Sequence, residues 1–69
     1  MDEVLNMSMR KFLKQVGVTS QQAIEAALRD AQEAGRLPPG PLRARAVVTV
    51  EGLDIEHVVN GIIRTEEET

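Results

Sequence analysis

Few side chains in this sequence could carry catalytic chemistry, and the first to consider is His57. Histidine is the usual general acid or base of enzymes at neutral pH. This one is the only histidine, and the chain has no cysteine that could act beside it as a nucleophile. Ser8 and Ser20 lack the strand, turn and helix context in which a catalytic serine is presented. We therefore expect no catalytic residue, and a structural role for His57 on an apolar strand face.

Three acidic residues, Glu51, Asp54 and Glu56, lie close together in the sequence and could form a weak site for a divalent ion. A solvated polar strand face explains the same residues. The spacing is not that of an EF-hand, no glycine-rich phosphate loop is present, and the absence of cysteine excludes a thiolate zinc site. The sequence therefore predicts no metal and no cofactor.

A basic cluster followed by a polar segment suggests nucleic-acid binding as an alternative function. The segment from Phe12 to Ile24 has a glycine and flanking valines between two helical patterns, as in a helix-turn-helix. Its candidate contacts are Arg10, Lys11, Lys14, Gln21 and Gln22. The following acids Glu25, Asp30 and Glu33 would repel phosphates, and the formal net charge is −3. An ordinary pair of helices explains the pattern equally well, so the charge balance disfavours a nucleic-acid partner.

The N-terminal half has two apolar patterns with helical spacing. The first predicts a helix over residues 3–16, with Asp2 as its N-cap and Gly17 as its stop. Thr19 and Gln22 then read as a capping box that starts a second helix, which ends at Gly35 before the proline-rich linker 37–41. The large apolar residues of these two helices are the expected helical core: Phe12, Leu13, Ile24 and Leu28.

The C-terminal half predicts a β-hairpin from two stretches rich in β-branched residues, 42–50 and 53–63. With Glu51 and Gly52 as a two-residue loop, Val48 faces Ile55, Ala46 faces His57 and Ala44 faces Val59. A register shifted by one residue would set charged residues against the apolar face. Glutamate before glycine suits a type II turn, or a strained type I′ turn, so the turn type stays open. The core face of this hairpin is expected to carry Val48, Val50, Leu53, Ile55 and Val59.

The other face of the predicted hairpin is polar apart from a small apolar patch. A two-stranded sheet has two open edges, and exposed apolar patches mark contacts with other molecules. We expect the patch to bind a second copy of the chain or another protein partner. In a monomer, arginine side chains could instead cover it with their methylene groups. The candidate interaction surface consists of Val47, Val58, Ile62 and Arg45.

Length and composition limit the fold to one small domain. The chain has 69 residues, of which 42% are hydrophobic and 28% charged, so only a small core can form. The expected fold class is α+β, with two helices packed on one face of a C-terminal antiparallel hairpin in the order ααββ. A single domain over residues 1–65 would precede a disordered acidic tail, 66–69. No secretory signal or membrane span is expected, which predicts a cytoplasmic protein.

Two segments of the chain carry a resemblance to a known family. They are residues 6–25 and, in the hairpin, Glu51 to Leu53 together with His57. They resemble a family of short uncharacterised bacterial proteins, classed as a domain of unknown function. The likeness covers nearly the whole chain, with residues 40–45 the least similar. It implies a small stand-alone cytosolic bacterial protein and supplies no catalytic residues.

Overall fold

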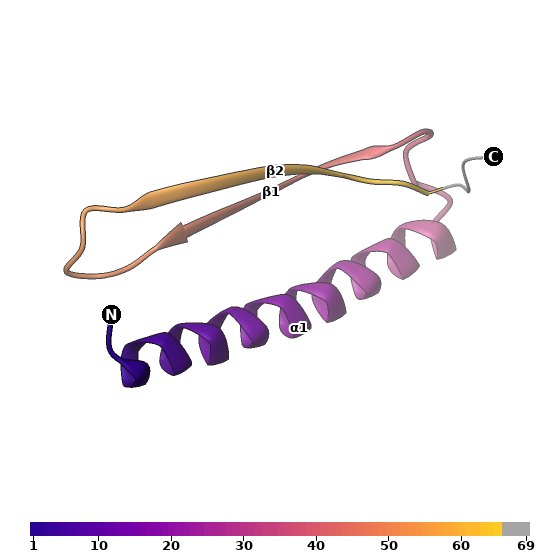
Figure 1. Cartoon of the computed structure of the whole chain (residues 1–69). Helices are drawn as coiled ribbons and strands as arrows, with labels where there is room; N and C mark the ends of the chain where they lie inside the picture. Colours follow the sequence, from indigo (N-terminus) through magenta and orange to yellow (C-terminus); the bar gives the residue numbers. More distant parts are fainter. Residues whose placement is uncertain (66–69) are drawn as a thin grey trace. The chain divides into compact units, whose positions relative to one another are not determined.

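The computed structural model describes residues 1–65 and contains one helix and one hairpin (Figure 1). Helix α1 spans Glu3–Glu33, strand β1 spans Leu42–Thr49 and strand β2 spans Glu56–Ile63. The helix belongs to one compact unit, Met1–Leu37, and the hairpin to a second that begins at Pro38. The α+β class is confirmed, whereas the expected acidic tail, 66–69, lies outside the described residues.

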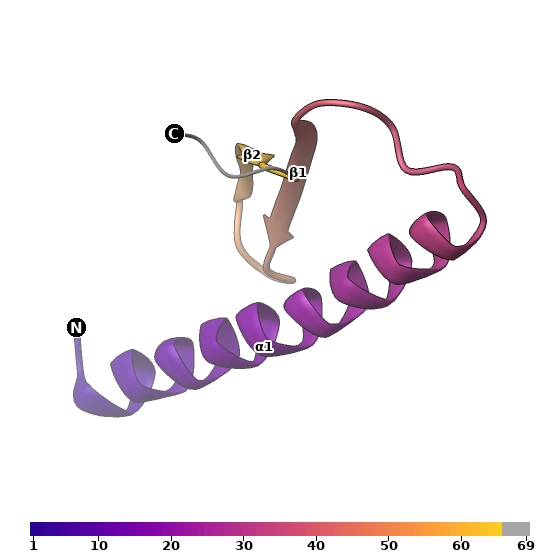
Figure 2. The same cartoon turned by 90° about the vertical axis from the view of Figure 1, so that its right-hand side faces the viewer.

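The prediction of two helices in the order ααββ is wrong, because α1 continues through Gly17 without a turn. Its ribbon is uninterrupted in two perpendicular views (Figures 1 and 2). Gly17 is not among the glycines with positive φ, so it does not adopt the stop conformation. Thr19 does not cap a new helix; its hydroxyl donates to the carbonyl oxygen of Gln15, one turn earlier, at 2.8 Å. This bond is typical of a threonine inside a helix.

The apolar pattern explains why one helix forms. An α-helix has about 3.6 residues per turn, so residues three or four apart lie on the same side. The apolar positions on the two sides of Gly17 follow this spacing in one unbroken phase. They form the apolar stripe of α1, which consists of Leu5, Met9, Phe12, Leu13, Val16, Ala23, Ile24, Ala27 and Ala31, with the small polar residue Ser20 between Val16 and Ala23. A break at Gly17 would also leave backbone donors and acceptors unpaired at two new helix ends.

Both ends of α1 carry the predicted signals. The backbone N–H of Leu5 donates to the Asp2 carboxylate at 2.9 Å, which confirms Asp2 as the N-cap. At the other end, Gly35 has φ of 68°, and its N–H donates to the carbonyl of Gln32 at 3.1 Å. The N–H of Arg36 donates to the carbonyl of Ala31 at 2.8 Å. These two bonds form a Schellman motif, so Gly35 ends the helix as predicted.

Two glycine substitutions should change stability in opposite directions. A methyl group added at Gly17 would meet no atom within 4 Å, and alanine is the better helix former. Gly17→Ala should therefore raise the free energy of unfolding by about 0.5–1 kcal/mol. Gly35→Ala should lower it by about 1–2 kcal/mol, because alanine is strained at positive φ. Urea denaturation followed by circular dichroism measures both changes, and a destabilised Gly17→Ala would contradict the continuous helix.

The hairpin register differs from the predicted one by two residues. In the structure Val48 faces His57, Ala46 faces Val59 and Ala44 faces Gly61. A shift of two residues keeps every side chain on its predicted face, because strand side chains alternate with a period of two. The predicted apolar and polar faces are therefore confirmed, although the predicted partners are wrong.

The turn explains this shift. The N–H of Leu53 donates to the carbonyl of Val50 at 3.1 Å, with Glu51 and Gly52 as the central residues. Gly52 has φ of 86°, whereas no residue other than glycine among residues 1–65 has positive φ. This pattern fits a type II turn and excludes type I′. Type II turns do not match the twist of a two-residue hairpin, so pairing begins further out, at Thr49 and Glu56.

The described residues include no buried side chain, so neither unit forms a core by itself. Phe12 remains 49% exposed and Leu13 55% exposed. Ile24, Val50, Leu53, Ile55 and Val59 are also exposed, while Leu28 and Val48 are half-buried. The reason is that a helix cannot cover its own apolar side and a two-stranded sheet has no second layer. Packing of the helix on the hairpin, within one domain over 1–65, stays a prediction.

Candidate interaction surfaces

The apolar stripe of α1 is the longest exposed apolar surface within a single element that the structure describes. Its large members include Leu5, Met9 and Phe12, each of which leaves more than 40% of its surface exposed. Val16 and Ala31 are half-buried. The charged and amide side chains of the helix lie mainly on its other sides, so the helix is amphipathic. Analysis of two separate helices missed this stripe, although its unbroken phase across Gly17 is visible in the sequence.

The hairpin face that includes Val47 and Val58 carries the predicted interaction surface. Val47 and Val58 face each other directly across the two strands, and Ile62 lies on the same face opposite Arg43. Val47 is 45% and Ile62 55% exposed, while Val58 is half-buried. Arg45 lies between Arg43 and Val47 on β1 and pairs with Asn60. The structure therefore gathers the four predicted residues on one strand face.

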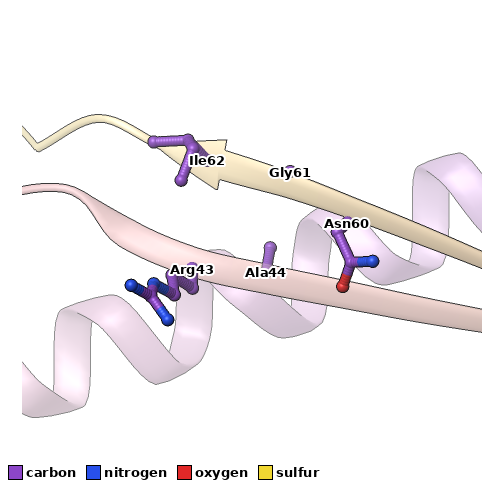
Figure 3. Close-up of a pocket in the computed structure, with 5 residues that line it drawn as sticks. All are labelled: Arg43, Ala44, Asn60, Gly61 and Ile62. Atoms are coloured by element: carbon purple, nitrogen blue, oxygen red, sulfur yellow. The ribbon is translucent and has the colours of Figure 1, made fainter.

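A shallow hollow lies on the hairpin near the open ends of the strands (Figure 3). It is lined by Arg43, Ala44, Asn60, Gly61 and Ile62. Ala44 and Gly61 are cross-strand partners, and the small Ala44 side chain and the lack of a side chain at Gly61 leave room at this level of the sheet. Among the described residues of the lining, Arg43 carries the only charged group. These residues do not form a pair of groups for acid–base chemistry.

The candidate nucleic-acid contacts lie on one helix, since the turn of the predicted helix-turn-helix is absent. That motif is therefore wrong for this chain. By helical spacing the five candidate contacts lie on the side of α1 opposite the apolar stripe: Arg10, Lys11, Lys14, Gln21 and Gln22. The side-chain amide of Gln21 donates to the carboxylate of Glu25 at 3.0 Å, which places a negative charge beside it. Nucleic-acid binding by this cluster stays a disfavoured prediction.

The potential chemical groups of the hairpin do not converge. His57 is exposed and lies on the face with Val48, its cross-strand partner, and Ala46. Glu51 and Asp54 are in the turn region, and Glu56 begins β2 on the other face from His57. Among residues 1–65, no group of three histidine, cysteine or acidic side chains is placed to hold a metal ion. The surfaces that the structure does assemble are apolar and suited to contact with another macromolecule.

The fold and these surfaces define a small α+β protein with an amphipathic helix and a single hairpin. A family model described as a family of unknown function, DUF6494, matches residues 1–66, and the chain belongs to that family. This confirms the resemblance to a domain of unknown function. No curated protein and no solved structure matches the chain. In the part of the chain that the structure describes, no helix is long and apolar enough to cross a membrane.

Proposed function

We propose that this protein is a non-enzymatic interaction module that binds a second copy of itself. The observation that carries the proposal is the exposure of large apolar side chains in a chain whose described residues include none that is buried. Burial of apolar surface is the main favourable term in folding and association. A second copy would supply burial that neither unit provides by itself.

The intrinsic stability of the two units supports this proposal. A lone helix in water is marginal, and most helices in proteins are held by packing of their apolar side. A two-stranded hairpin is also marginal without a further layer. Each unit therefore needs contacts beyond its own backbone hydrogen bonds. Chains of this size commonly obtain them by oligomerisation.

The absence of convergent chemistry also favours an interaction function over an enzymatic one. His57 has nonpolar Val48 as its cross-strand partner, and the described residues that line the hollow beside Arg43 include no general acid or base. Catalytic sites bring such groups within hydrogen-bonding reach of one another. The side chains that do lie together, Val47 and Val58, are suited to contact.

The substitution Val58→Glu tests the contribution of the hairpin face that includes Val47 and Val58. We expect it to weaken the dimer about tenfold, or about 1.4 kcal/mol, because it places a charge at a half-buried apolar position of that face. Sedimentation equilibrium over a wide dilution range measures the dissociation constant. The control is Gln22→Glu, which adds the same charge to α1 away from both apolar surfaces and should have little effect. A dissociation constant for Val58→Glu that is as little changed as that of Gln22→Glu would remove this face from the interface.

A further inference from the structure

We propose that the second copy binds through the apolar stripe of α1, with the two helices antiparallel and centred at Val18. The inference rests on the proposed self-association and adds to it the orientation and register of the partner. Val18 is the midpoint of a helix that runs from Glu3 to Glu33. Centring the pair there overlaps the helices along their full length and gives an interface with twofold symmetry.

The uneven size of the side chains along the stripe indicates the antiparallel orientation. The N-terminal half is built from large residues: Leu5, Met9, Phe12, Leu13 and Val16. In the C-terminal half four of the five members are small, Ser20, Ala23, Ala27 and Ala31, and Ile24 is the exception. Two helices whose side chains differ in size along their length pack most evenly when large side chains of one meet small side chains of the other.

Antiparallel helices centred at Val18 bring a large and a small residue together in four of the five residue pairs of the stripe. Residues equally distant from Val18 then lie at the same level, one from each copy. The large-to-small levels are Leu5 with Ala31, Met9 with Ala27, Leu13 with Ala23, and Val16 with Ser20. Phe12 and Ile24 make the one level with two large side chains, and both lie toward the margins of the stripe. The four large-to-small levels therefore hold similar total volumes.

A parallel pair would pack poorly. Each residue of the stripe would then meet its own equivalent, so that Phe12 would meet Phe12 at one end and Ala27 would meet Ala27 at the other. The bulky end would hold the axes apart, and the alanine end would contain voids. Both overpacking and cavities destabilise an interface.

The area of the stripe is sufficient for a stable dimer. At about 1.5 Å per residue, a helix of 31 residues is about 46 Å long. One third of the accessible surface of such a helix is about 670 Å², so two copies would bury about 1,300 Å². Stable interfaces bury about 1,200–2,000 Å² in total. The stripe alone reaches this range.

Disulfide cross-linking tests the orientation cleanly, because the chain has no cysteine of its own. Two full-length variants are made, Met9→Cys and Ala27→Cys, and are oxidised separately and as a mixture. In the antiparallel pair these positions lie at the same level in the middle of the stripe, whereas two copies of Met9 lie about 27 Å apart. We expect the mixture to yield at least about tenfold more cross-linked dimer than either variant alone. Mass spectrometry identifies the mixed product by its mass.

The matched control is a mixture of Lys11→Cys and Glu25→Cys. These positions are equally distant from Val18 but lie on the side of α1 away from the stripe, so they should not cross-link. Sedimentation equilibrium of the unmodified chain separates the two proposals. Two results would contradict antiparallel pairing through the stripe but not self-association: a cross-link between two copies of Met9→Cys, or a dimer in which the Met9→Cys and Ala27→Cys mixture does not cross-link. A monomer at every concentration would overturn both.

Discussion

Val16→Asp should weaken self-association at least about a hundredfold, or by about 2.7 kcal/mol. Val16 is near the centre of the apolar stripe and is already half-buried in the single chain. A carboxylate there would lie in the middle of the antiparallel helix pair, next to the partner's Ser20, with no cation to pair it. Burial of an unpaired charge is among the most costly changes that an interface can undergo. Sedimentation equilibrium measures the change in dissociation constant.

Val18→Asp is a closely matched control for this substitution. It makes the same residue change two positions along the same helix, so helix propensity is affected equally. Val18 is 50% exposed and lies on the side of α1 opposite the stripe. The dissociation constant of Val18→Asp should stay within a few fold of the unmodified chain. Similar losses for both variants, or a dimer that survives Val16→Asp, would show that the stripe is not the interface.

Ser20→Pro should destabilise the protein by about 3 kcal/mol or more if α1 is continuous. Proline in a helix interior removes a backbone donor and clashes with the carbonyl four residues earlier, here that of Val16. If a second helix began at Thr19 instead, Ser20 would occupy its first turn, where proline is well tolerated. Urea denaturation monitored by circular dichroism gives the free energy of unfolding.

Two controls separate the backbone effect from other causes. Ser20→Ala removes the same hydroxyl without changing the backbone and should leave stability nearly unchanged. Glu3→Pro places proline at the first position of α1, after Asp2 in an extended conformation with ψ of 164°, and should cost little. A Ser20→Pro variant as stable as Glu3→Pro would mean that the chain turns near Gly17.

Local signals predicted the ends of α1 but not its continuity. Asp2 and Gly35 act as the sequence indicates, because their roles depend only on nearby backbone groups. Gly17 and Thr19 also fit a helix boundary, yet both residues are compatible with a helix interior. The phase of the apolar stripe distinguishes the two cases, since it stays unbroken from Val16 to Ala23. That signal spans several turns and is missed when each helix is examined alone.

The sequence predicted correctly which hairpin residues share a face, but it did not predict which residues pair across the two strands. The alternation of residues around Val48 fixed which side chains share a face, and Gly52 was correctly placed in the turn. The register depended on the turn type, which Glu51 left open. The sequence pattern shows which residues favour burial but not which surface covers them. The hairpin patch was predicted, whereas the continuous stripe of α1 was treated as the faces of two separate helices.

The measurement that tests the central claim most directly is the melting temperature of the unmodified chain as a function of its concentration. If the second copy supplies the missing burial, mass action makes the folded state more stable at higher concentration. We predict that the melting temperature, followed by circular dichroism, rises steadily as the concentration increases about a hundredfold. A melting temperature that is independent of concentration, with a monomer mass throughout, would contradict the proposal that this protein completes its fold by binding itself.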